Sequence, residues 1–205
     1  MMGKTHMLGG ICLAGTMVLV GQSIHPLPDL ITLAAFFGGS VVGSLLPDID
    51  EPDSKISRKM PIVSTLLSAD RHRKSRAAKR WFMTEEERAR AKTQLRDASH
   101  RGRTHYLLPW SIYLIISVIF ALFEAKAHTG DMLWRMLLAF LVGINPGAFS
   151  HLLLDIISGK IPLFAPFYRK SIGICLFRTG SFLELIFVRL SLLLADILII
   201  IQIVS

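Results

Sequence analysis

Five long apolar runs dominate the sequence and restrict the folds that it can adopt. They cover residues 7–24, 30–46, 106–123, 132–157 and 182–204. Each approaches or reaches the roughly 20 residues that a helix needs to cross the hydrocarbon core of a bilayer. Because lipid offers the backbone no hydrogen-bond partners, spanning segments of this kind fold as helices. The sequence therefore predicts an all-α fold, a polytopic membrane helix bundle of about five spanning helices.

One long polar segment, residues 51–99, separates the second run from the third. We expect it to form a basic insertion within a single membrane-embedded domain, residues 1–205. Its densest basic stretch, residues 71–80, favours contact with anionic phospholipids, at about 1 kcal/mol per basic residue. Nucleic acid is disfavoured as a partner, because no series of aromatic residues accompanies these charges.

The distribution of Lys and Arg predicts the orientation in the membrane. If the N-terminus is cytoplasmic, that side receives all 23 Lys and Arg residues except Lys126, Arg135 and Arg189. Cytoplasmic loops of membrane proteins carry such an excess. The expected topology therefore has a cytoplasmic N-terminus and an outside C-terminus. The first run lacks a cleavage pattern of small residues, so we expect an uncleaved span.

In this topology, polar residues at four helix ends meet at the cytoplasmic face. They are His6 before the first run, Asp48 and Asp50 after the second, His100 and His105 before the third, and His151 and Asp155 at the inner end of the fourth. Imidazole and carboxylate groups are typical zinc ligands. The sequence therefore predicts a divalent-metal site, with zinc expected from the share of imidazoles. Seven candidates exceed the four ligands of one tetrahedral zinc, so one or two ions are possible.

Each part of this set has another interpretation when taken alone. His151 and Asp155 are four residues apart, so they share a helix face and could merely hydrogen-bond each other. The two aspartates after Pro47 could simply form a turn. The histidines at 100 and 105 could belong to a basic membrane anchor, and a single histidine near a terminus carries little meaning. It is their convergence at one face that favours a site.

Residues near the expected ligands are candidates for substrate binding and catalysis. Arg101 and Arg103 lie beside the histidines of the third run and are predicted to bind a substrate phosphate. Glu184 follows Gly180-Ser181 near the inner end of the fifth run. We predict catalytic roles, in proton transfer or in orienting the ligands, for Asp50, His100 and Glu184.

The pattern of motifs resembles the YdjM-like family of inner-membrane, LexA-regulated predicted metal-dependent hydrolases. The resemblance is carried by Thr5-His6, Leu45-Leu46-Pro47-Asp48-Ile49-Asp50, His100-Arg101-Gly102-Arg103-Thr104-His105, Ser150-His151 with Asp155, and Gly180-Ser181 with Glu184. It implies a multi-pass protein of the bacterial cytoplasmic (inner) membrane. The chain departs from the family pattern beside the expected ligands, at Glu51 and Tyr106, and this bears on substrate preference.

Two functions from different classes fit these residues. The first is a membrane-bound metal-dependent hydrolase that acts at the cytoplasmic face on a phosphoester or lipid-linked substrate. The alternative is a non-enzymatic membrane protein with a structural metal, whose basic loop recruits a cytoplasmic partner or anionic lipid. A transporter is disfavoured because the polar residues gather at one face. Arg189 and Asp196 lie within the fifth run, and the arginine is expected to pair with an acidic residue there.

Overall fold

The computed structural model describes residues 3–50, 54–67, 84, 86, 103–127, 131–168, 170–177 and 180–204. The basic stretch at 71–80, His100 and Arg101 lie outside the described residues, and so does the side chain of Arg103. Predictions that concern these groups therefore stay predictions.

Long helices account for the five apolar runs, as predicted. They are α1 (Gly3–Gln22), α2 (Leu30–Gly43), α7 (Leu107–Ala127), α8 (Met132–Ser158), and the continuous pair formed by the π-helix η3 (Leu183–Val188) and α9 (Arg189–Val204). Within the described part of the chain, five helical segments have the length and apolar character to cross a membrane. The prediction of an all-α membrane bundle is confirmed. The helix bounds lie within about four residues of those expected from hydropathy.

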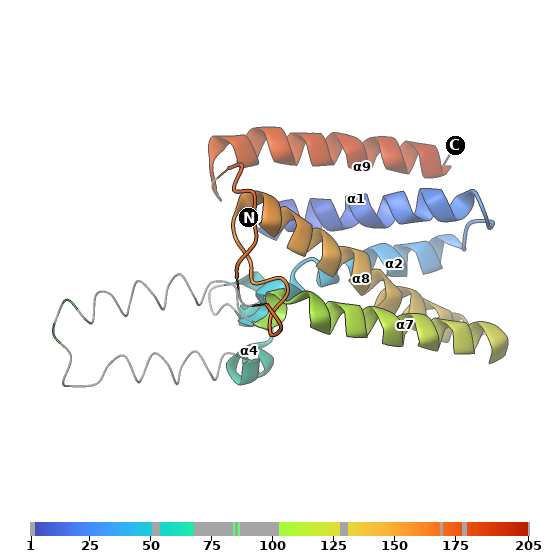
Figure 1. Ribbon diagram of the computed structural model, residues 1–205. Helices are drawn as coiled ribbons and strands as arrows, with labels where there is room; N and C mark the ends of the chain where they lie inside the picture. Colours follow the sequence, from blue (N-terminus) through green and yellow to red (C-terminus); the bar gives the residue numbers. More distant parts are fainter. Residues whose placement is uncertain are drawn as a thin grey trace.

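The helices lie side by side around α1 and α8 (Figure 1). Helix α1 packs against α2, α8 and α9, and α7 packs against α8. The N-terminus and the C-terminus lie at opposite ends of the bundle (Figure 1). The outward faces of α7 and α9 are rich in exposed apolar side chains, among them Ile115, Ile119 and Leu198. Such faces fit a lipid environment.

Glycines allow α2 and α8 to pack with their backbones in contact. Gly39 and Gly43 on α2 are four residues apart, and so are Gly143 and Gly147 on α8. A Cβ atom added at any of the four would overlap a backbone carbonyl of the facing helix. This arrangement is the small-residue packing by which membrane helices approach closely. This packing places the C-terminal end of α2 beside the C-terminal half of α8.

Helix α8 continues without interruption through Pro146. A proline has no N–H to offer the carbonyl four residues earlier, which here belongs to Val142. The side-chain amide of Asn145 donates to that carbonyl oxygen over 2.9 Å, and also to Ser117 Oγ of α7 over 2.9 Å. Asn145 therefore satisfies the carbonyl left by the proline and ties α7 to α8.

Short elements gather at one end of the bundle, which we term the site end. They are the 3₁₀ turns η1 (Leu46–Asp50) and η2 (Arg103–His105), and the short helices α3 (Lys55–Lys59) and α4 (Pro61–Leu67). The loop after α8 folds back on itself through the Ile161–Ile172 bridge. Its Leu163 carbonyl accepts a hydrogen bond of 2.8 Å from Leu107 N, which holds the start of α7 in place.

Candidate metal centre

Five side chains from four elements converge at the site end. Helix α1 contributes His6 from its first turns, η1 contributes Asp48, η2 contributes His105, and α8 contributes His151 and Asp155. Two groups of three have donor atoms that all lie within 4.8 Å of one another. These groups are His6, His151 and Asp155, and Asp48, His105 and His151. The arrangement brings three imidazoles and two carboxylates together from segments up to 149 residues apart.

Four nitrogen–oxygen separations in this cluster are close to those of a tetrahedral metal site. His105 Nε2 lies 3.3 Å from Asp155 Oδ2 and 3.6 Å from Asp48 Oδ1. His151 Nε2 lies 3.5 Å from Asp48 Oδ1 and 3.8 Å from Asp155 Oδ2. A tetrahedral zinc with bonds of about 2.0–2.2 Å separates its ligands by about 3.3–3.6 Å. Asp48 and Asp155 fall in different groups of three donors, so one ion held by all four side chains would require these two carboxylates to move closer together.

His6 lies beside this group of four. Its ring stacks on that of His151, with the centroids 3.7 Å apart, and its Nε2 lies 3.6 Å from Asp155 Oδ1. The two oxygens of Asp155 therefore face different histidines, Oδ1 towards His6 and Oδ2 towards His105. Asp155 is the side chain that joins both parts of the cluster.

The backbone of α2 orients His151. Its Nδ1 lies 2.7 Å from the carbonyl oxygen of Ser44, the C-cap residue of α2. Because a carbonyl only accepts, Nδ1 carries the hydrogen and Nε2 is directed at the carboxylates. Metal-binding histidines usually donate their second ring N–H to such an oxygen. With Nδ1 engaged, His151 can offer one nitrogen to one ion.

The cluster is buried except at Asp48. The side chains of His6, His105, His151 and Asp155 are at most 4% exposed, whereas that of Asp48 is 27% exposed. His105 Nε2 and His151 Nε2 face the carboxylates and make no hydrogen bond within the described residues. Buried ring nitrogens that face carboxylates without hydrogen bonds fit metal ligands. Solvent or a substrate would approach from the Asp48 side.

The carboxylates also set the protonation of His105, which precedes α7. Burial lowers the pKa of this imidazole, but the interactions of its ring with Asp155 and Asp48 outweigh burial and raise the pKa to about 9. In the metal-free protein a proton on His105 therefore offsets the negative charge of the two aspartates. A divalent ion would replace this proton.

A second buried network adjoins the cluster through Thr5, the neighbour of His6. Thr5 Oγ1 donates to Glu184 Oε1 over 2.9 Å and accepts from Arg189 Nε over 3.0 Å. Gly180 N donates to Glu184 Oε2 over 2.6 Å. The network links α1 to the start of the fifth span. The linking role of Thr5 was not identified from the sequence, because a single threonine in an apolar run gives no distinguishing signal.

The other predicted site residues differ in where they lie. Asp50 is buried on η1 but belongs to neither group of metal donors. Glu184 is fully buried and lies in the Thr5 network. The carbonyl of Ser44 was not predicted, because a backbone oxygen leaves no mark in a sequence.

Comparisons with known proteins give one result. A family model described as YdjM inner membrane protein matches residues 1–204, nearly the whole chain. No curated protein and no solved structure matches.

Proposed function

The chain belongs to the YdjM inner membrane protein family, and we propose that it is a membrane-bound metal-dependent hydrolase. In this proposal its centre lies at the cytoplasmic membrane face and acts on a phosphoester or lipid-linked substrate. The metal is zinc, held by His105, His151, Asp48 and Asp155. His6 either completes the set or, with Asp155 Oδ1, contributes to a second ion.

The observation that supports this proposal most strongly is the spacing of the four donor atoms. The four separations between imidazole nitrogens and carboxylate oxygens, 3.3–3.8 Å, are close to the roughly 3.3–3.6 Å between the ligands of a tetrahedral zinc. Four of the five side chains in the cluster are buried at the end of the bundle, and burial of ionisable groups there is costly without a task. A divalent ion offsets the two negative charges and accepts the lone pairs of the imidazoles.

The exposure of Asp48 supports a catalytic centre. Zinc, when bound in such a set, lowers the pKa of its water towards about 7 and so supplies a nucleophile at neutral pH. Asp48 is the one ligand open to solvent, and a substrate would enter beside it. Asp50, two residues further along the same turn, and His100 are proposed to transfer protons. Glu184 is proposed to act through Thr5, which precedes His6.

Basic residues beside His105 in the sequence suggest how a substrate phosphate would be held. Arg101 and Arg103 precede His105 in the chain, and we propose that they bind the phosphate. The distribution of Lys and Arg supports a cytoplasmic position for this end of the bundle, by the positive-inside rule. The basic segment at 71–80 would there contact anionic phospholipids.

A metal and activity measurement on matched variants tests the proposal. Wild type, His105→Ala and Asp155→Ala would be purified in mild detergent, and their metal content measured by plasma mass spectrometry. Hydrolysis of a chromogenic phosphodiester and of a short-chain phospholipid would be followed in parallel. His25→Ala is the control, since His25 is exposed on the turn between α1 and α2. Both site variants should lose metal and hydrolysis. Wild-type metal content in both, or hydrolysis that survives removal of the metal, contradicts the proposal.

A structural metal site is the second candidate, favoured by the burial of four of the five side chains. The basic loop would then recruit a cytoplasmic partner or anionic lipid. Deletion of residues 70–96 separates the two functions. A hydrolase should keep its metal and its chemistry, whereas a recruiting protein should keep the metal and lose partner or lipid binding.

A further inference from the structure

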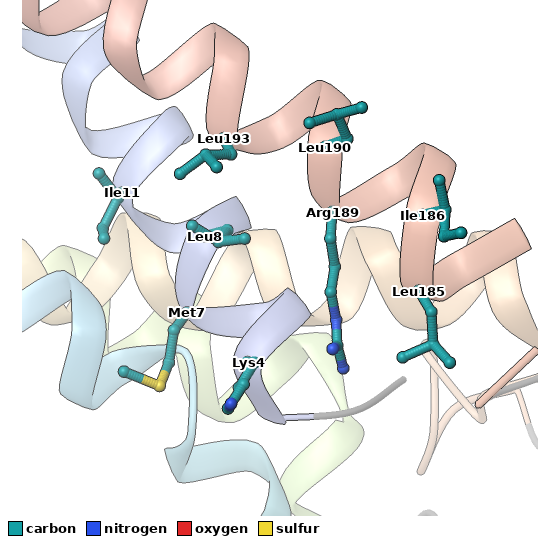
Figure 2. Close-up of a pocket in the computed structure, with 9 residues that line it drawn as sticks. All are labelled: Lys4, Met7, Leu8, Ile11, Leu185, Ile186, Arg189, Leu190 and Leu193. Atoms are coloured by element: carbon teal, nitrogen blue, oxygen red, sulfur yellow. The ribbon is translucent and has the colours of Figure 1, made fainter. Parts of the chain in front are cut away.

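A groove of about 700 Å³ lies between α1 and the fifth span, and none of the metal donors lines it. Its walls are apolar and include Leu8 and Ile11 of α1 and Leu193 of α9 (Figure 2). The groove follows the direction of the spanning helices, so it would lie within the membrane. An extended apolar chain fits such a surface, because it removes the apolar walls from water or from loosely packed lipid without needing hydrogen bonds.

Two cations lie at one end of this groove. Lys4 and Arg189 are the only charged residues among those that line it, and their side chains extend towards the same end (Figure 2). That end is the site end, because Lys4 lies in the first turn of α1. A groove that is apolar along its length and cationic at its end matches a phospholipid, with an acyl chain in the membrane and a phosphate at its surface.

The guanidinium of Arg189 has a donor without an acceptor among the described residues. Its Nε donates to Thr5 Oγ1 over 3.0 Å, which fixes the plane of the group. Its Nη2 is buried and has no hydrogen-bond partner among the described residues. A charged donor of this kind at a membrane helix is costly unless an acceptor is present. Guanidinium groups bind phosphate through two parallel N–H donors, and this explains why an arginine suits the position.

We propose that this groove binds one anionic phospholipid, with its phosphate held by Lys4 and Arg189 and one acyl chain between α1 and α9. The anionic headgroup is favoured over a zwitterionic one because both cations lie at the same end. The nearby carboxylate of Glu184 is fully buried and accepts from Thr5 and Gly180. The residues that line the groove do not include the basic segment at 71–80, and occupancy of the groove does not depend on hydrolysis at the metal centre.

Photo-crosslinking with mapped adducts tests the proposal. The purified protein, in phosphatidylcholine nanodiscs, receives a small amount of phosphatidylglycerol with a diazirine on one acyl chain. In a parallel sample the diazirine lipid is phosphatidylcholine. After illumination, adducts are located by peptide mass spectrometry. We expect phosphatidylglycerol adducts to concentrate at residues 7–11 and 185–193. They should exceed phosphatidylcholine adducts there about tenfold, the effect of one charge-assisted hydrogen bond.

Variants decide whether the cations are responsible. Arg189→Gln should remove the preference for phosphatidylglycerol, whereas Arg135→Gln, which changes a cation on α8 outside the groove, should leave it unchanged. Lys4→Gln and Leu190→Trp leave the Arg189–Thr5 bond intact and should each reduce the labelling, which keeps the test decisive if Arg189→Gln does not fold. Equal labelling by both lipids overturns the proposal. So do adducts spread evenly over the outward face of α7, or a preference that survives all three groove variants.

Discussion

His151 Nδ1 lies 2.7 Å from the carbonyl oxygen of Ser44, so the close packing of α2 on α8 sets the orientation of an imidazole in the candidate metal centre. The glycine pairs of both helices bring Ser44 of α2 against Gly147 of α8, one helical turn before His151. The Nε2 atom is then directed at Asp48 and Asp155. Helix packing and site geometry are therefore coupled, and each can be tested through the other.

The tautomer of His151 follows from this contact. We expect its Nδ1 to carry the hydrogen in every neutral form of the ring, because the Ser44 carbonyl can only accept. Two-bond proton–nitrogen correlation spectra of protein with labelled histidine would report this directly. The exposed His25 provides the comparison, since no hydrogen bond to its ring is found within the described residues. An unprotonated Nδ1 in His151 would contradict the hydrogen bond to Ser44, and with it the orientation of the ring by α2.

Substitution of Gly39 should disturb the metal centre from a distance. The Cβ of Gly39→Ala would overlap the carbonyl of Phe140, so α2 and α8 would have to separate. We expect a loss of about 1–3 kcal/mol in the free energy of unfolding, as for overpacked cores, together with weaker metal binding. Gly38→Ala is the matched control, because its Cβ would meet only the Phe140 ring at 3.9 Å. Unfolding in mixed detergent micelles and zinc titration measure the two effects. Equal behaviour of the two variants would contradict the coupling.

Asn145 should matter for stability more than for chemistry. Asn145→Ala leaves the Val142 carbonyl without a donor and breaks the link to Ser117, which we expect to cost about 1–2 kcal/mol. Ser117→Ala removes only the link to α7 and should cost less. The free energies of unfolding of both variants, measured side by side, test this order. A larger loss for Ser117→Ala would show that the Val142 carbonyl does not need the amide.

The raised pKa of His105 predicts a pH dependence for the metal-free protein. The folded value of about 9 lies above the ordinary 6.5, so the His105 contribution to stability is complete below pH 6.5 and is lost as pH rises through 9. Thermal unfolding of the metal-free protein between pH 6 and 10 should show this loss. In His105→Gln this part of the pH dependence should be absent, and a profile equal to wild type would contradict the assignment.

The same proton competes with zinc. Because a bound ion needs the neutral ring, His105 should release one proton on metal binding below pH 9. Its contribution to the zinc affinity should therefore rise about tenfold per pH unit up to that value. Calorimetry in buffers of different ionisation enthalpy counts the released protons. Asp29, an exposed cap residue far from the site, gives Asp29→Asn as a control that should leave the count unchanged.

Much of the candidate site could be predicted from local sequence patterns. The spacing of His151 and Asp155 by four residues places both on one helix face, and their donor atoms do lie 3.8 Å apart. The sequence spacing of Asp48 and Asp50, by contrast, did not predict which of the two joins the donors. A 3₁₀ turn has three residues per turn, so side chains two positions apart diverge by about 120°. Asp48 meets the histidines, whereas Asp50 belongs to neither donor group.

Hydropathy alone determined the five spans and the helix ends at which polar residues gather, because the transfer of a segment into lipid depends on its own composition. Family membership likewise follows from motifs that stand in the sequence. Tertiary structure decided which donor atoms meet, which backbone carbonyl holds His151, and how Thr5 joins Glu184 to Arg189. Those contacts depend on how helices distant in sequence rotate about their axes and approach one another. Local sequence periodicity contains no information about either.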